Sequence, residues 1–238
     1  MDRNEFPTEQ WARWARDFIA LRTSLMDLAT KRALHRAHMV ALEKWQEDDG
    51  TGVVHQWMVE NYADSMLIGL RRLVDKTRGV LSLVKLLEAI AQNHAAFSIT
   101  RYLEFWQCTY PGINVARARF AYARFSRDGR TFDQEQVRAD LRKLEEDHED
   151  ILAHIDAVVA HREHPSRDEL REDFKSGPRP ELTWQHLDRL FDDIGALFNK
   201  YNPLVDPGAY IDFERVLPAG YEQAFIRMLA PSQRRDRD

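Results

Sequence analysis

The sequence predicts an all-α protein, a bundle of about five to six helices with a long N-terminal helix. Apolar residues recur at steps of three and four over most of the 238-residue chain, which is the period of an amphipathic helix. Runs that alternate between polar and apolar residues, which indicate strands, are scarce. Hydrophobic residues make up 44% of the chain although 31% of its residues are charged, so the composition favours a folded helical protein over a disordered one.

Three helices are predicted in the N-terminal part of the chain. The first covers residues 8–47 and is broken by the Asp-Asp-Gly-Thr-Gly sequence of residues 48–52. The second covers about residues 53–76, and Gly79 separates it from a third helix that Ser82 caps. Their apolar positions are, in chain order, Trp11, Trp14, Phe18, Leu21, Leu25 and Leu28, then Trp57, Tyr62, Met66, Leu70, Leu73 and Val74, then Leu83, Leu86, Leu87 and Ile90.

A fourth helical segment is predicted near residues 100–107, and it ends before Pro111 and Gly112. Residues 112–131 are predicted to be the least regular part of the interior. The last long helix covers about residues 183–201, with apolar positions at Leu187, Leu190, Ile194, Leu197 and Phe198.

Between these segments the sequence predicts one long helix. Thr131 followed by Gln134 matches a capping box. The helix that it opens runs to His161 or His164 and stops before the following proline, because the residue before a proline avoids the helical conformation. Glycine and prolines within the charged segment 166–181 then predict a loop.

We expect residues 1–202 to form a single helical domain. Within it, residues 1–50 are the N-terminal helix and residues 53–202 are the core. Residues 203–238 contain several prolines, one short helix near residues 221–229 and a polar tail, so they are expected to form a C-terminal extension.

Bulk properties limit the function classes. The net charge of −5 means that any contact with RNA or DNA must use a local basic patch. The single cysteine, Cys108, excludes a disulfide framework and a cysteine-based zinc site. The N-terminus is too polar for a signal peptide, and no apolar run approaches the roughly 20 residues that cross a bilayer. We therefore expect a cytoplasmic protein that does not bind a membrane.

The most informative stretch is residues 151–165, at the end of the long predicted helix. Asp147, Asp150, His154 and His161 fall on one side of that helix, because seven residues make about two turns. A carboxylate beside a histidine orients its ring, so this ribbon suits general acid–base chemistry. The alternative is a simple surface pair of Asp150 with His154, while His161 stabilises the C-terminal end of the helix.

Metal binding is a weaker interpretation of the same helix. Glu145 and His148 form one Glu-x-x-His unit, which di-iron helical bundles use in pairs. No other histidine has a glutamate three residues before it. We therefore expect neither a metal site nor a cofactor.

A basic segment, residues 114–130, is the candidate RNA-binding surface. It contains Arg117, Arg119, Arg124, Arg127 and Arg130, with Phe120, Tyr122 and Phe125 interleaved. Guanidinium groups bind phosphates in a fork, and aromatic faces stack on unpaired bases, which suits single-stranded RNA. The alternative places the aromatics in the core and leaves the arginines solvated or paired with the acidic helix that follows.

Three segments occur in an order that carries a resemblance. They are residues 65–90 (SMLIGLRRLVDKTRGVLSLVKLLEAI), the helix that ends AHREH at residues 160–164, and the amphipathic helix after the loop. This order resembles the HEPN superfamily, in particular its abortive-infection, AbiU-type branch, over roughly residues 52–201. The resemblance implies a HEPN-like bundle that forms a homodimer and acts in prokaryotic defence or in a toxin–antitoxin pair. Many members of the superfamily cleave RNA without a metal, and others only bind RNA or proteins.

The family motif is an arginine, four to six residues and a histidine at a helix end. His161 takes the histidine position, but the allowed arginine positions hold His154, Ile155 and Asp156. The resemblance implies that His161 is the acid or base. His154 is then a second carrier of a proton or a charge, and Arg162 supplies charge from another angle.

The same spacing also occurs at three other places, from Arg32 to His38, from Arg142 to His148 and from Arg179 to His186. That is the number expected by chance, so spacing alone identifies no site. Within residues 65–90, Arg71 and Asp75 are four apart and are expected to pair across one turn.

Two functions from different classes remain open at this point. The first is an RNA-directed defence or toxin protein, with metal-independent endoribonuclease as its candidate activity. In that case His161, His154 and Asp150 are catalytic, and Arg117, Arg119, Arg124 and Arg162 bind RNA. The second is a catalytically inactive HEPN-like scaffold that dimerises and binds a protein partner, such as a cognate antitoxin or a defence-system protein.

Overall fold

The computed structural model describes residues 8–44, 52–109, 112, 114–163, 182–206, 210–218, 220–221 and 223–224. These residues contain helices and no strand, which confirms the all-α prediction. The chain divides into two compact units. Unit 1 comprises residues 1–22 and 67–211, and unit 2 comprises residues 23–66 and 212–238.

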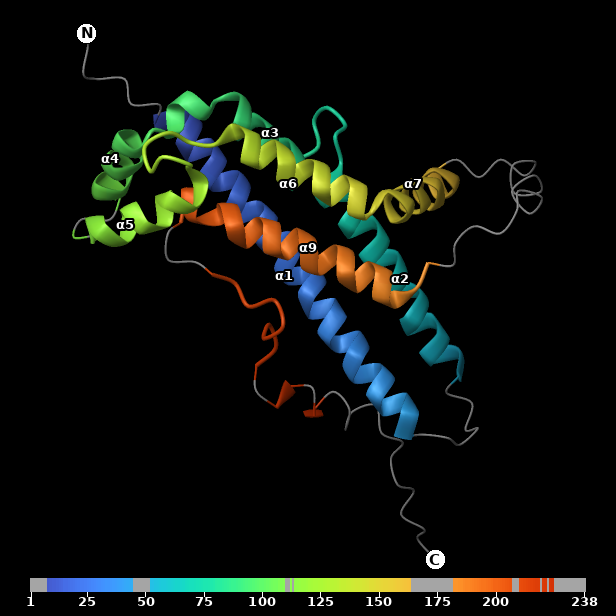
Figure 1. The fold of residues 1–238 in the computed structure, drawn as a ribbon. Coiled ribbons are helices and arrows are strands. Elements are labelled where there is room, and N and C mark those ends of the chain that lie inside the picture. Colours follow the sequence, from blue (N-terminus) through green and yellow to red (C-terminus); the bar gives the residue numbers. More distant parts are fainter. Residues whose placement is uncertain are drawn as a thin grey trace, which may run out of the picture. The chain divides into compact units, whose positions relative to one another are not determined.

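The described residues form eight α-helices and three short 3₁₀ helices (Figure 1), more than the five or six predicted. The α-helices are α1 (Thr8–Lys44), α2 (Gly52–Val74), α3 (Leu83–Gln92), α4 (Ile99–Thr109), α5 (Val115–Tyr122), α6 (Gln134–Asp147), α7 (Glu149–Glu163) and α9 (Trp184–Tyr201). The 3₁₀ helices are η1 (His94–Phe97), η2 (Ala123–Phe125) and η3 (Asn202–Leu204).

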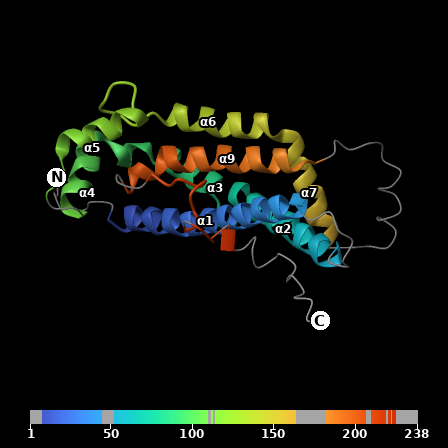
Figure 2. The same cartoon turned by 90° about the horizontal axis from the view of Figure 1, so that it is seen from below.

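Aromatic side chains build the core of unit 1. Trp11, in the first turns of α1, packs against Phe97 and Phe105 with ring centroids 4.6 and 4.5 Å apart. Phe18, two turns later, contacts Phe198 of α9 at 5.7 Å. Helix α9 lies beside α6 in both views (Figures 1 and 2), and the Tyr201 hydroxyl donates to Asp140 of α6 at 2.5 Å. Unit 1 therefore has a continuous core along α6 and α9.

Helices α3 and α9 begin where the sequence predicts. The Ser82 hydroxyl oxygen accepts a hydrogen bond from the backbone N–H of Lys85 and so caps α3. Thr183 caps α9 in the same way, and His186 returns a bond to the Thr183 backbone N–H, which completes a capping box.

The prediction that residues 112–131 form an irregular segment is wrong, because this segment contains α5 and η2. Asn114 caps α5 by accepting from the backbone N–H groups of Ala116 and Arg117. Tyr122 and Phe125 are buried, and the Tyr122 hydroxyl donates to the Phe97 carbonyl oxygen. Tertiary packing thus stabilises a helix too short to be predicted from periodicity.

The capping box predicted at Thr131 is also wrong. Asp133 caps α6 instead, since its carboxylate accepts from the backbone N–H groups of Glu135 and Gln136 at 3.1 Å each. The Thr131 hydroxyl donates to Asp128, so it belongs to the preceding turn.

The single long helix predicted to end at residue 161 or 164 is two helices, α6 and α7. The chain leaves helical geometry at His148, whose φ is −130° and ψ 17°. The break moves Glu149 and Asp150 into the first turn of α7, where the helix dipole favours negative charge. It also leaves His148 buried, with its Nε2 atom 2.7 Å from Asp193 Oδ2 of α9. Both effects favour the break over a continuous helix.

Unit 2 contains an antiparallel pair formed by the rest of α1 and most of α2. His38 contacts His55, and His35 contacts Tyr62, so the contacts run in opposite directions along the two helices. Arg32 is only 2% exposed and forms an ion pair with Glu214. The predicted short helix at residues 221–229 falls largely outside the described residues.

No helix in the part of the chain that the structure describes is long and apolar enough to cross a membrane.

Candidate functional site

The residues predicted to be catalytic lie on α7. Asp150 is exposed in its first turn, and His154 is half-buried one turn later. Helical backbone continues through residue 163, and the spacing of seven residues places position 161 on the same side as position 154. The side chains of His161 and Arg162 lie outside the described residues, as does all of His164.

Helix α7 has two distinct sides. Its inner side carries Leu152, Ile155 and Asp156, which line a pocket in unit 1. A helix turns by about 100° per residue, so Asp150 and His154 lie on the opposite, outer side. Ile155 is completely buried, whereas Asp150 is exposed. The inner side therefore attaches α7 to the rest of unit 1, and the outer side faces away from this packing.

The pocket beside α7, here called the α7 pocket, has a volume of about 540 Å³. The end of α2, the turn that follows it, α3, α6 and α7 enclose it. Its floor is aliphatic, formed by Val74, Val84, Leu144, Leu152 and Ile155, and its rim carries Arg71, Asp75, Lys76, Glu145 and Asp156. Opposite charges therefore alternate around an apolar floor.

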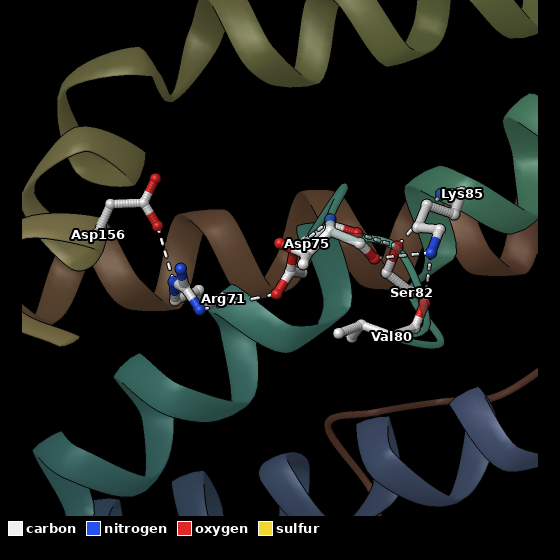
Figure 3. A network of polar contacts seen from close by, with 7 residues as sticks. Arg71, Asp75, Val80, Ser82, Lys85 and Asp156 are labelled. Carbon is white, nitrogen blue, oxygen red and sulfur yellow. Dashed lines mark hydrogen bonds and ion pairs between the residues drawn. The ribbon is translucent and has the colours of Figure 1, made fainter. Parts of the chain in front are cut away.

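Ion pairs from α2 and its following turn hold the two halves of the predicted long helix. Figure 3 shows Arg71 between Asp156 and Asp75, with its Nε atom 2.8 Å from Asp156 Oδ1. Its Nη1 atom is 3.6 Å from Asp75 Oδ2, so the predicted pair across one turn is confirmed. Lys76 pairs with Glu145 of α6.

The turn after α2 is fixed by its own hydrogen bonds (Figure 3). The Ser82 hydroxyl donates to the Asp75 carbonyl oxygen at 2.6 Å, and Lys85 Nζ donates to the carbonyl oxygens of Thr77 and Val80 at 2.7 and 2.9 Å. Gly79 takes a φ of +90°, which a residue with a side chain rarely adopts. These contacts make the Arg71 side of the α7 pocket rigid.

Asp75 stays ionised in this network. Burial alone would raise the pKa of its carboxyl, but hydrogen bonds from Thr77 and the charges of Arg71 and Lys85 outweigh burial and lower that pKa below 3.8. A charged Asp75 therefore holds Arg71 at every physiological pH.

Helix α5 and η2 carry the predicted RNA-binding arginines. Arg117, Arg119 and Arg124 are exposed, and the structure gives none of them a carboxylate partner among the residues it describes. Phe120 is 70% exposed, and the Arg124 guanidinium lies 5.6 Å from its ring centroid. Of the interleaved aromatics, Phe120 is therefore available for stacking, whereas Tyr122 and Phe125 are in the core.

The structure does not bring the two sets of predicted residues together. Helices α5 and α7 lie at opposite ends of α6 in both views (Figures 1 and 2). The 14 residues of α6 span about 21 Å. Asp147, which the sequence places in one ribbon with His154, ends α6 rather than sharing α7.

Two contacts were not predicted from the sequence. One is the bond between Arg71 and Asp156, which joins α2 to α7. The other is the contact of His148, at the end of α6, with Asp193 of α9. No local sequence pattern predicts either contact, because the two partners are 85 residues apart in the first contact and 45 in the second.

The structure separates the residues of the suggested Glu-x-x-His unit. Glu145 pairs with Lys76, and His148 pairs with Asp193. Among the described residues, no three histidine, cysteine or acidic side chains converge as metal ligands.

Comparison with known proteins gives one finding. The family model HEPN_AbiU2, described as AbiU2, matches residues 43–215, which is well over half of the chain. The match covers α2 to α9, and with them the α7 pocket and α5. No curated protein and no solved structure matched the chain.

Proposed function

Because the chain belongs to the HEPN_AbiU2 family, the AbiU-type abortive-infection branch of the HEPN superfamily, we propose that it acts on RNA as a metal-independent endoribonuclease. The observation that carries this proposal is the two-sided character of α7. Its inner side is used for attachment to unit 1, and its outer side presents Asp150 and His154. Asp150 and His154, two members of the acid–base ribbon predicted from the sequence, therefore lie on the side of α7 that faces away from this packing.

In this proposal His161 takes or gives the proton in the cleavage of a phosphodiester. A base removes the proton of the 2′-hydroxyl, that oxygen attacks phosphorus, and an acid protonates the departing 5′-oxygen. Two copies that pair through the outer side of α7 would supply two ribbons to one cleft. His154 is the second carrier of a proton or a charge, and Asp150, four residues before it, orients its ring.

RNA binding is assigned to Arg117, Arg119 and Arg124 on α5 and η2, with Arg162 beside the catalytic ribbon. Exposed guanidinium groups without a described carboxylate partner attract phosphates, and Phe120 offers a face for one base. Because α6 separates α5 from α7 by about 21 Å, a single strand of several nucleotides would contact both.

Cleavage of single-stranded RNA in the presence of EDTA tests the proposal. General acid–base groups contribute about 10²- to 10⁴-fold, so His161→Ala should reduce the cleavage rate by at least about 100-fold, and His154→Ala by less. His94, exposed in η1 and far from α7 in sequence, provides the matched histidine control. Equal activity of His161→Ala and His94→Ala would contradict the proposed role.

One observation favours the second candidate, a catalytically inactive scaffold. The arginine that the family motif requires is absent from α7, and Arg71, which reaches that helix from α2, is engaged by Asp75 and Asp156. On this view α7 is a docking surface for a protein partner. A stable dimer that cleaves no RNA, with or without divalent metal, would favour the scaffold.

A further inference from the structure

Unit 2 contains a pocket that the proposed catalytic site does not use. It lies between α1 and α2, and its volume is about 250 Å³. The residues that matter for its chemistry are His35, His38, Trp57, Asn61, Tyr62 and Ser65. Its α1 residues precede the family match, which begins at residue 43, and its α2 residues lie within that match.

Flat aromatic surfaces form the walls of this pocket. Tyr62 is only 8% exposed and stacks on His35, with centroids 3.9 Å apart and ring planes inclined by 9°. Trp57 is 62% exposed and lines the same pocket. A fixed aromatic pair beside an exposed indole is a surface on which another planar ring can stack.

A contact between two imidazoles, of which that of His38 is buried, keeps the two helices of the pocket together. His38 is 1% exposed, and its Nε2 atom lies 2.6 Å from Nδ1 of His55. One histidine of α1 is thereby tied to one of α2, so the pocket exists before a ligand arrives. A preformed pocket avoids the cost of ordering its walls on binding.

Polar groups lie beside the aromatic walls. Asn61 donates one amide hydrogen to the Trp57 carbonyl oxygen at 2.7 Å, and its amide oxygen has no hydrogen-bond partner among the described residues. The same holds for the hydroxyl of Ser65, one turn further along α2. Asparagine and serine side chains bond to the edges of nucleobases. An aliphatic or phenyl side chain from a protein would leave these groups desolvated without a partner.

The volume limits the size of the ligand. Pockets that enclose a whole drug-sized ligand usually measure about 300 to 1,000 Å³, so about 250 Å³ suits one ring system with the rest of the ligand outside. From the stacking walls, the edge-binding groups and this size, we propose that unit 2 holds a binding pocket for one unpaired nucleobase. The choice of single-stranded RNA as its source rests on the proposed function.

The test uses the full chain and a short single-stranded RNA with one central 2-aminopurine, methylated at the 2′-oxygens so that it cannot be cleaved. Stacking in the pocket should quench the 2-aminopurine fluorescence. Trp57→Ala should weaken binding about tenfold, which is typical for the loss of one base–aromatic stack, and Trp57→Phe should retain most of the affinity. Trp184→Ala is the matched control, because Trp184 is also partly exposed, at 37%, but lies on α9 in unit 1.

Free adenosine, followed by saturation-transfer NMR, separates this inference from the proposed function. Binding of adenosine that depends on Trp57, without binding of the RNA, would support the pocket and contradict an RNA-directed function. RNA binding that is equal in the wild type and in Trp57→Ala would overturn the pocket. If Trp57→Ala changes the sedimentation coefficient but leaves RNA binding unchanged, that result would also overturn the nucleobase pocket, and it would identify this surface as a protein interface.

Discussion

The cationic side chains at the two ends of α6 differ in whether carboxylates pair with them. At the α7 end, Arg71 is 34% exposed and is held by Asp75 and Asp156, while Lys76 is held by Glu145. At the α5 end, Arg117, Arg119 and Arg124 are exposed, and the described residues provide them with no carboxylate. Both regions belong to unit 1, so the same fold neutralises one set of cations and leaves the other set uncompensated.

This difference distinguishes cations that attach one helix to another from cations that are available to a ligand. A guanidinium that already has two carboxylate neighbours must give one up before it can bind a phosphate, whereas an uncompensated guanidinium gains a partner at no such cost. We therefore propose that the cations of the α7 pocket position α7 and that those of α5 bind RNA. Experiments that change one set of cations and leave the other intact test this proposal.

The largest expected effect is on RNA affinity after charge reversal at α5. In the triple variant Arg117→Glu, Arg119→Glu and Arg124→Glu, affinity for single-stranded RNA should fall by more than about tenfold, because three phosphate contacts are lost. The slope of log K against log salt concentration should become shallower by about 2, since each contact with a single strand contributes about 0.7. Fluorescence anisotropy at several salt concentrations measures both quantities.

Arg127 provides the control for this variant. It lies in the same basic segment and is 79% exposed, but Asp133 pairs with it. Arg127→Glu should therefore change RNA affinity less than Arg117→Glu does. Equal losses in the two single variants would show that segment charge, not the absence of a carboxylate partner, determines binding.

The next largest effect is on stability, at the junction between α6 and α7. His148→Ala removes a buried ring, so it should lower the free energy of unfolding by about 2 kcal/mol. His94→Ala, at an exposed position, should change it by less than about 0.5 kcal/mol. Urea denaturation followed by circular dichroism provides the values. If the two variants are equally stable, the His148–Asp193 contact does not hold the start of α7.

The sequence predicts those parts of the fold that depend on interactions between residues close together in the chain. The first residues of α3 and α9 are predicted to within one position, since the caps Ser82 and Thr183 act on backbone within three residues. Helix α5 is missed because Tyr122 stabilises it through Phe97, 25 residues away. The break at His148 is missed for the same reason, since its partner is Asp193 on another helix.

The candidate site follows the same rule. Asp150 and His154 share one side of α7, because four residues on one helix suffice for that arrangement. The sequence could not show that Leu152, Ile155 and Asp156 occupy the opposite side against α2, since that requires the tertiary contact of Arg71 with Asp156. It also could not show that α5 and α7 are separated by the length of α6.

A smaller effect is expected from the Arg71–Asp156 pair. The two side chains are 34% and 66% exposed, and exposed pairs contribute about 0 to 1 kcal/mol, so Arg71→Ala alone should cost little stability. Arg71→Lys, which keeps a cation between Asp75 and Asp156, should retain more of the RNA cleavage than Arg71→Ala does. Arg72→Ala is the matched control, because Arg72 follows Arg71 on the same helix but is exposed, and its loss should leave cleavage unchanged. Full activity of Arg71→Ala would show that the pair does not position α7.

The smallest expected change is in how stability depends on pH, which should differ between the α7 pocket and unit 2. Burial first, and the neighbouring His55 second, lower the pKa of His38 below its ordinary value of 6.5. The unfolded chain therefore binds more protons than the folded chain as the pH falls below 6.5, and unit 2 loses stability there. Asp75 has a lowered pKa, so its contribution to the α7 pocket is present above pH 3.8 and is lost only as the pH falls below that value.

Amide hydrogen exchange at several pH values can follow the two regions separately, after correction for the intrinsic exchange rate. Between pH 7 and pH 5, protection should fall in residues 23–44 and 52–66 of unit 2 while it is maintained in α3, which packs under the α7 pocket. His55→Asn removes only the second cause of the lowered pKa of His38, so it should weaken the pH dependence of unit 2 in part and leave α3 unaffected. If both regions lose protection together, the lowered pKa of His38 does not set the response of unit 2 to acid.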